Sequence, residues 1–351
     1  EGFQSHCDIK YTPSKEDYAR WGYQRRENPH GGKLEWRGKP GSDNYYSFLK
    51  GRLDKGNDDI YLDSDWAKVL GAVDFIRGYK GEKPLCMFIP LGFPHPPYGV
   101  EEPYFSMIDR RKLPPRAVVP ETMPGKPEIL KKLRTLLGTA EWTEERWTEL
   151  RSVYYGMCAR VDDQFGRVLD ALTERGFYDD SAVFIFPDHG DYAGDYGIVE
   201  KTQNTFEDCL TRVPLVMKPP RGVPVKPGIS DALVELVDFP ATVYELTGIT
   251  PPYSHFGKSL LPVLANPDVA HRDAVFSEGG RLLHETHITH ESHFSSYADP
   301  KESLYWPRCG LDDVNGKPYS GKAVMCRTKT LKYIRRFYER DELYDLVKDP
   351  S

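Results

Sequence analysis

The chain contains little that would tie it to a membrane, a nucleic acid or a zinc ion. Its longest apolar run, LCMFIPLGF from Leu85 to Phe93, is far shorter than the roughly 20 residues of a membrane-spanning helix, so no span is expected. The formal net charge is −6 and no basic stripe is present, which argues against binding to nucleic acid. The six cysteines form no Cys-x-x-Cys pair. A zinc knuckle is therefore not expected, whereas disulfides stay open.

What the chain does contain is an alternation of helix-like and strand-like segments. Between Thr143 and Arg175, apolar residues recur at steps of three and four, and Gly176 follows as a stop signal. This spacing predicts a long amphipathic helix. The apolar runs AVFIF (182–186) and VPLVM (213–217) come after it and predict buried strands. We expect an α/β fold, with a mostly parallel central sheet covered by helices on both faces.

The pattern changes near the carboxyl end. DAVFSE (273–278), AVMCRT (323–328) and LKYIRRF (331–337) are short strand-like runs with turn residues between them. We therefore expect a smaller antiparallel subdomain over residues 271–351, which follows a larger α/β domain over residues 1–270.

A carboxylate and an imidazole follow the strand predicted at 182–186. Asp188 and His189 lie where this strand ends, and ligands of open α/β sheets gather at the carboxyl ends of strands. Both side chains can bind a divalent cation, and Gly190 lets the backbone approach closely. For an isolated Asp-His-Gly run, a capping role for Asp188 and an ordinary structural place for His189 are the commoner alternative.

Two further residues favour a catalytic site over that alternative. Lys201 follows the glycine-containing loop AGDYGI (193–198), which is able to fold back over the same strand end. His95, in FPHPPY, leaves the apolar run LCMFIPL (85–91) by the same strand-then-loop arrangement. A lysine and a histidine beside a metal can stabilise an oxyanion and protonate a leaving oxygen. We interpret both residues as catalytic.

Four segments of the chain also occur, in the same order, in one known family. They comprise a helix and strand, the Asp-His-Gly segment with its lysine, a Val-Asp-Phe-Pro-Ala-Thr segment, and strands ending in Glu-Leu-Tyr-Asp-Leu, at 154–186, 187–216, 236–264 and 332–350. Together they resemble the sulfatase family of the alkaline-phosphatase-like superfamily. The ordered series is far more specific than any one of its motifs.

The resemblance implies roles for the four candidate residues. Asp188 and His189 would bind a metal, with Ca2+ as the family's usual ion and Mn2+ or Mg2+ as alternatives. Lys201 and His95 would contact the sulfate or the leaving-group oxygen. The resemblance also implies a formylglycine nucleophile, formed from the first residue of Cys/Ser-x-Pro/Ala-x-Arg, and a pair of metal-binding aspartates near the family's beginning.

Neither that nucleophile motif nor that aspartate pair occurs in this sequence. YTPSK (11–15) shares only the Thr-Pro-Ser centre of the motif and is better explained as the beginning of a helix. We expect the nucleophile on an amino-terminal segment that is not in this chain, either in a longer polypeptide or as a partner fragment.

The expected function is sulfuric ester hydrolysis on a sulfated carbohydrate, with a small sulfate ester as the other candidate substrate. In the tract HETHITHESH (284–293), we expect one of His284, His287 and His293 to reach the substrate. A phosphonate monoester or phosphodiester hydrolase of the same superfamily stays an alternative, as does a catalytically incomplete binder of sulfated glycans. The resemblance favours a periplasmic or secreted location, with the cytoplasm as the alternative. EGFQSHCDIK does not have the form of a signal peptide, so the compartment is not read from a targeting segment.

Overall fold

The computed structural model describes residues 4–6, 14–23, 47–81, 83–117, 125–290, 299–312 and 318–348. The α-helices in these residues are α1 (Lys15–Trp21), α2 (Ser64–Gly78), α3 (Tyr104–Met107), α4 (Glu128–Leu136), α5 (Glu144–Glu174), α6 (Asp208–Thr211), α7 (Asp238–Thr247) and α8 (Leu261–Ala265). The strands are β1 (Gln4–His6), β2 (Leu49–Arg52), β3 (Leu85–Met87), β4 (Tyr98–Val100), β5 (Val183–Ile185), β6 (Val216–Lys218), β7 (Val275–Gly279), β8 (Ala323–Arg327), β9 (Leu331–Arg336) and β10 (Glu342–Asp345). Short 3-10 helices are η2 (Arg110–Lys112), η3 (Asp195–Gly197), η4 (Pro300–Glu302) and η5 (Trp306–Leu311).

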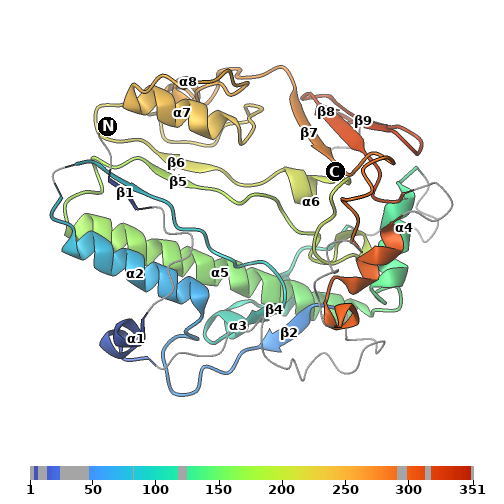
Figure 1. Ribbon diagram of the computed structural model, residues 1–351, viewed down its shortest axis with the longest axis horizontal. Coiled ribbons are helices and arrows are strands. Elements are labelled where there is room, and N and C mark those ends of the chain that lie inside the picture. Colours follow the sequence, from blue (N-terminus) through green and yellow to red (C-terminus); the bar gives the residue numbers. More distant parts are fainter. Residues whose placement is uncertain are drawn as a thin grey trace.

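The α/β part is layered. Figure 1 shows β5 and β6 between α7 and α8 on one side and α2 and α5 on the other. The strands form three described pairs: β1 with β3 and β2 with β4, both parallel, and β5 with β6, antiparallel. The last pair needs no crossover helix, because antiparallel strands can be joined by a loop that reverses direction. The predicted α/β fold with helices on both faces is confirmed.

Helix α5 is the longest element of this helical layer. Thr143 is its N-cap and accepts a hydrogen bond from Arg146 N at 3.4 Å, and Gly176 just beyond its end has φ +68°. A left-handed residue at that place ends a helix, and glycine adopts the conformation without steric cost. The helix predicted between Thr143 and Arg175 is therefore confirmed to within a residue at each end.

The hydrophobic core lies along the inward side of α5. Leu150, Val153 and Met157 of α5 are fully buried and pack in one cluster with Trp66 of α2 and Tyr98 of β4. Burial of an aliphatic side chain of this size contributes about 1.5–3 kcal/mol. The core therefore fixes α2, α5 and β4 relative to one another, and β4 carries the loop that contains His95.

The carboxyl-terminal sheet has the strand order β10-β9-β8-β7 and is antiparallel throughout. The strands predicted at 273–278, 323–328 and 331–337 are confirmed as β7, β8 and β9 with small shifts at their ends. The boundary between residues 270 and 271 stays a prediction.

This sheet packs against the segment that follows Lys201. Arg336 Nη1 donates to Asn204 O at 2.9 Å, and Lys332 Nζ donates to Phe206 O at 3.2 Å. A Cβ atom on Gly279 would lie 1.5 Å from Gln203 O, so only glycine permits the contact. The antiparallel sheet thereby helps to hold the candidate site's loop.

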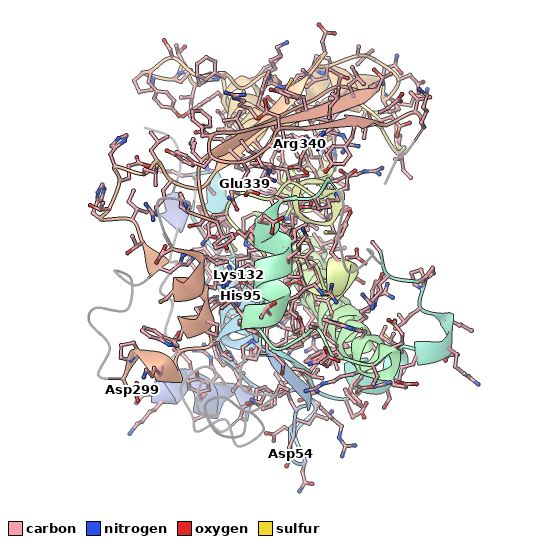
Figure 2. All side chains as sticks on the ribbon, turned by 90° about the vertical axis from the view of Figure 1, so that its right-hand side faces the viewer. Asp54, His95, Lys132, Asp299, Glu339 and Arg340 are labelled. Carbon is pink, nitrogen blue, oxygen red and sulfur yellow. The ribbon has the colours of Figure 1, made fainter. Side chains whose placement is uncertain are left out.

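The sheet also reaches α4 through its β9–β10 turn. Glu339 Oε2 accepts a hydrogen bond from Glu128 N at 2.9 Å, at the amino end of α4. Figure 2 shows Glu339 and Arg340 toward one end of the molecule and Asp299 and Asp54 toward the other. His95 lies between these ends in the same view.

The helix start expected at residues 11–15 lies only partly within the described residues. Helix α1 begins after Ser14, whose side chain and Asp17 form a capping box, while Tyr11 to Pro13 lie outside the described residues. Among the residues described, no helix combines the length and the apolar character that crossing a membrane requires.

Candidate active site

Asp188 and His189 lie in the turn after β5, where the sequence predicts a metal site. The His189 Nδ1 atom is 2.8 Å from Gly190 O, and its Nε2 atom is 3.5 Å from Asp188 Oδ2. The turn is packed tightly, because Gly190 N donates to Leu210 O and a Cβ on Gly190 would lie 1.9 Å from Cys209 O. Glycine is therefore required between the imidazole and the loop that follows it.

The geometry of these two side chains leaves both open to an ion, and their role as metal ligands stays a prediction. A carbonyl oxygen only accepts, so Nδ1 of His189 donates to Gly190 O and Nε2 is the ring nitrogen left to bind a metal. This is the usual arrangement of a metal-ligating histidine. The side chains of Asp188 and His189 are 85% and 38% exposed, so an ion could reach both. In the described part of the chain, no cluster of three or more His, Cys, Asp or Glu residues is arranged to hold a metal.

Lys201 and His95 come together although they are far apart in the sequence. The loop after His189 folds back through hydrogen bonds from Tyr192 N to Glu200 O at 3.0 Å and from Gly194 N to Ile198 O at 2.9 Å. Lys201 Nζ then lies 2.9 Å from His95 Nε2. The sequence predicted that this loop would return, and the structure brings the two residues into contact. Their catalytic roles stay a prediction.

The ring of His95 has a defined orientation. Its Nδ1 atom is 2.6 Å from Pro96 O, and this carbonyl can only accept. Nδ1 therefore carries a proton, and Nε2 accepts from the Lys201 ammonium group. Because Nδ1 is held by the backbone, Nε2 is the nitrogen that can take up and deliver a proton.

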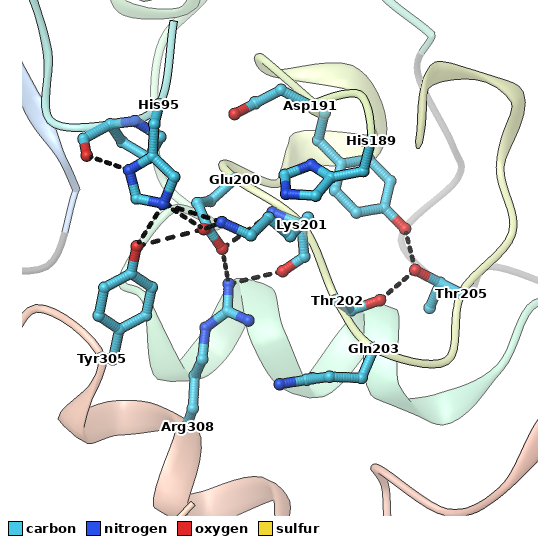
Figure 3. A network of polar contacts seen from close by, with 12 residues as sticks. His95, His189, Asp191, Glu200, Lys201, Thr202, Gln203, Thr205, Tyr305 and Arg308 are labelled. Atoms are coloured by element: carbon cyan, nitrogen blue, oxygen red, sulfur yellow. Dashed lines mark hydrogen bonds and ion pairs between the residues drawn. The ribbon is translucent and has the colours of Figure 1, made fainter. Parts of the chain in front are cut away.

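Glu200 lies beneath this pair and is fully buried. Figure 3 shows the side chains that converge on its carboxylate, which are those of His95, Lys201, Tyr305 and Arg308. Oε1 accepts from Lys201 Nζ and from the Tyr305 hydroxyl, the latter at 3.2 Å. Oε2 accepts from Arg308 and from Lys201 N, the latter at 2.9 Å. Burial alone would raise the pKa of Glu200, but Arg308 and Lys201 outweigh it and lower the pKa.

A second, half-buried carboxylate, Asp191, connects the loop of Lys201 to strand β4. The Tyr98 hydroxyl donates to Asp191 Oδ1 at 2.8 Å and accepts from Glu200 N at 2.8 Å. Asp191 also accepts from Ala193 N at 2.7 Å. Burial raises the pKa of Asp191 to about 6. Tyr98 belongs to β4, so these hydrogen bonds hold the loop of Lys201 against the strand that follows His95.

The histidine tract is connected to the site through a residue that the sequence did not single out. His290 Nδ1 is 3.1 Å from Asp312 Oδ1, and its Nε2 is 3.3 Å from Gln203 Nε2, two residues beyond Lys201. His284 and His287 have exposed side chains, and a substrate role for either stays a prediction. His293 lies outside the described residues.

Sequence reasoning also missed Glu200, Tyr305 and Arg308. Glu200 could have been suspected because it adjoins Lys201. Tyr305 and Arg308 stand near η5, far along the chain, and no spacing or motif connects them to the lysine. Only the folded chain shows that they meet at one carboxylate.

Two solved structures with this fold provide context. A phosphonate monoester hydrolase of Agrobacterium radiobacter has a TM-score of 0.58 and 24% sequence identity, over 81% of this chain and 55% of that one. A protein solved in complex with its substrate D-glucosamine-2-N,6-O-disulfate has a TM-score of 0.56 and 18% identity, over 82% of this chain and 64% of that one. At these identities the likeness shows the fold.

Sequence relatives point to one family. Arylsulfatase K of Rattus norvegicus is 26% identical over 308 residues, which are 83% of this chain and 48% of that protein. The chain thus spans about half the length of the curated relatives it matches. A sequence model of the family described as Sulfatase matches residues 9–249. On this match, together with the ordered motifs and the α/β fold, the chain belongs to the sulfatase family.

Proposed function

We propose that the protein carrying this chain is a sulfuric ester hydrolase and that this chain supplies the charged half of its active site. The observation that carries the proposal is the contact between Lys201 Nζ and His95 Nε2 at 2.9 Å. Both side chains are partly exposed, at 26% and 41%, while the carboxylate that holds them is fully buried. The buried Glu200 carboxylate thus holds the Lys201 ammonium group and the His95 imidazole where both can contact a ligand from solvent.

The chemistry follows from the proton positions. The Lys201 ammonium group would donate to a sulfo oxygen and offset the negative charge that develops there. His95 would bind a proton at Nε2, with Nδ1 held by Pro96 O, and deliver it to the oxygen of the departing alcohol. Both roles use groups that are already adjacent, Lys201 Nζ and His95 Nε2.

Two groups that the proposed reaction needs, a metal ion and a nucleophile, are not themselves among the described residues. Asp188 and His189 would hold a divalent cation, for which Ca2+ is the proposed ion and Mn2+ or Mg2+ the alternatives, and it would supply positive charge to the sulfo group. A formylglycine would supply the nucleophile, on a proposed amino-terminal segment that is not in this chain. That segment would be part of the same polypeptide or a bound partner fragment.

The proposed substrate is a sulfated carbohydrate. Next to Lys201, Gln203 and the His290–Asp312 pair offer amide, imidazole and carboxylate groups at the rim of the site. Such groups suit the many hydroxyls of a sugar better than an apolar aryl ring. A solved protein of this fold acts on a disulfated glucosamine, which supports the choice.

One other activity fits the same arrangement. Phosphonate monoesters and phosphodiesters carry a single negative charge, as sulfate esters do, and one exposed lysine beside a histidine could serve either. A catalytically incomplete glycan binder is the remaining alternative.

The test uses the full-length natural protein with 4-nitrophenyl sulfate, 4-nitrophenyl phenylphosphonate and a sulfated glycan. We expect the sulfate ester to be cleaved with the higher kcat/KM, and a chelator to lower turnover on the order of 100-fold until Ca2+, Mn2+ or Mg2+ is restored. Faster cleavage of the phosphonate would favour the alternative hydrolase. Binding of the glycan without turnover of either ester would favour the binder.

A further inference from the structure

The charges around Glu200 are unequal. One buried carboxylate faces two cations, Arg308 and Lys201, which contact its two oxygens. Arg308 is almost as buried as Glu200, with 4% of its side chain exposed, and also donates to Lys201 O at 2.6 Å. Arg308 and Glu200 therefore neutralise each other inside the protein. Of these three charged side chains, Lys201 is the one whose charge is left for a ligand.

The backbone at Glu200 supports a special role for this residue. Its φ is +69°, in the left-handed region that non-glycine residues avoid. Such a conformation persists only when its surroundings hold it, and it concentrates at functional sites. Here the Tyr98 hydroxyl accepts from Glu200 N, and Tyr192 N donates to Glu200 O. The same turn brings the Glu200 carboxylate back under the side chain of its own neighbour, Lys201.

We propose that Glu200 positions Lys201 against His95 and restricts the site to esters with a single negative charge. The carboxylate fixes the ammonium group from below, so that Nζ remains within 2.9 Å of His95 Nε2. It also neutralises Arg308, so that the positive charge of Arg308 does not attract a second negative charge on the ligand. A sulfate ester, a phosphodiester and a phosphonate monoester each carry one charge, whereas an ionised phosphate monoester carries two.

The size of this discrimination follows from Coulomb's law. Two unit charges a few ångströms apart near a protein surface interact by several times RT. Removing the negative charge of Glu200 should therefore raise the affinity for a dianion relative to a monoanion by at least about tenfold. The inference rests on the proposed function, because it concerns which anions that same site accepts.

The experiment measures binding without turnover. Benzylsulfonate and benzylphosphonate are not hydrolysed, because carbon replaces the ester oxygen, and in mildly alkaline buffer they carry one and two negative charges. Calorimetry on the full-length protein gives the ratio of their dissociation constants. We expect wild type to prefer the sulfonate, and Glu200→Gln to shift the ratio at least about tenfold toward the phosphonate.

Two further variants distinguish the effect of the Glu200 charge from the positioning of Lys201 and from a general loss of stability. Glu200→Gln with Arg308→Gln removes both members of the buried pair, leaves no unpaired buried charge and retains the net charge of wild type. We expect its ratio to return close to wild type while both ligands bind several-fold more weakly, because Lys201 is no longer held. Glu101→Gln is the matched control, since Glu101 is an equally buried carboxylate paired to a buried arginine outside the site. Its ratio should not change.

The outcomes distinguish this inference from the proposed function. If both ligands bind in a manner that depends on Lys201 but the ratio is the same in wild type and Glu200→Gln, the inference is wrong and the proposed function survives. If the double variant binds both ligands as tightly as wild type, Glu200 does not position Lys201. If neither ligand binds in a manner that depends on Lys201, both proposals are overturned.

Discussion

Two clusters of buried charge in this molecule have opposite composition. In the core, one cation faces two anions, because Arg160 lies 2.7 Å from Asp63 Oδ2 and 3.1 Å from Glu101 Oε1. At the candidate site, one anion, Glu200, faces two cations. Each cluster buries an arginine–glutamate pair, so burial alone does not distinguish them.

The difference lies in where each cluster ends. The core cluster is closed, since Arg160 and Glu101 are fully buried and Glu101 also accepts from Trp66 Nε1. The site cluster ends in Lys201 and His95, which are partly exposed. A closed cluster with excess negative charge fastens helices and strands together. An open cluster with excess positive charge can receive an anion from solvent.

The pKa values follow the same division. Burial raises the pKa of Glu101, and Arg160 only partly offsets this. At Glu200, by contrast, two cations outweigh burial and lower the pKa. Sharing one cation between two carboxylates favours a proton on one of them, whereas sharing one carboxylate between two cations favours its ionised form.

The largest expected effect is on catalysis and belongs to the open cluster alone. In the full-length enzyme, Lys201→Ala and His95→Ala should each lower kcat for a sulfate ester by about 10²–10⁴-fold, because they remove charge stabilisation and proton delivery. Steady-state kinetics gives the rates, and thermal melting checks the fold.

Lys68→Ala provides the matched control for the lysine. Lys68 Nζ is 3.4 Å from Asp65 Oδ1 and donates to Pro90 O at 2.7 Å, in the same layer as the core cluster. Its loss should affect stability and leave kcat within a few-fold of wild type. Near-normal turnover in Lys201→Ala or His95→Ala would remove that residue from the site.

A smaller effect, now on stability, belongs to the closed cluster. Arg160→Met leaves Asp63 and Glu101 buried without their cation, and breaking a buried pair in this way costs about 3–5 kcal/mol. Chemical denaturation of the full-length protein measures the free energy of unfolding. A loss below about 1 kcal/mol would show that the two carboxylates do not depend on Arg160.

The smallest effect is a pH dependence of opposite sign at the two glutamates. For Glu200, whose pKa is lowered in the folded state, the stabilisation is present above the unfolded value of 4.5 and is lost as pH falls through the folded pKa. For Glu101, whose pKa is raised, the stabilisation is present below 4.5 and is lost as pH rises through the folded pKa.

Glutamine mimics the protonated carboxyl group, so each Glu→Gln variant should resemble wild type in acid. As pH falls from 4.5 through the folded pKa of Glu200, wild type should lose its advantage in stability over Glu200→Gln. As pH rises from 4.5 through the folded pKa of Glu101, Glu101→Gln should gain stability relative to wild type. Denaturation at several pH values measures both differences. Slopes of the same sign would refute the contrast between the clusters.

Particular residues show which parts of the fold and of the candidate site can be predicted from the sequence. Helix α5 and strands β7 to β9 were predictable, because periodicity and turn residues are local properties. The meeting of Lys201 with His95 was also foreseen, since both follow apolar strands and lie in loops at strand ends. The pairing of β5 with β6 as an antiparallel ladder could not be read from apolar runs, which do not encode strand direction.

The sequence alone does not predict which charged residues meet at the candidate site. Arg308 and Tyr305 reach Glu200 from a segment near the carboxyl-terminal sheet, and long-range ion pairs leave no periodic trace. His290 shows the same limit, because its four-histidine tract is conspicuous, yet only the fold reveals its contacts with Asp312 and Gln203.

The most direct test of the account is a crystal structure of the full-length protein with bound benzylsulfonate. We expect sulfonate oxygens within hydrogen-bond distance of Lys201 Nζ and His95 Nε2, with the Glu200 carboxylate still in contact with the lysine. A sulfonate bound elsewhere, with none of its oxygens in contact with Lys201 or His95, would contradict this expectation.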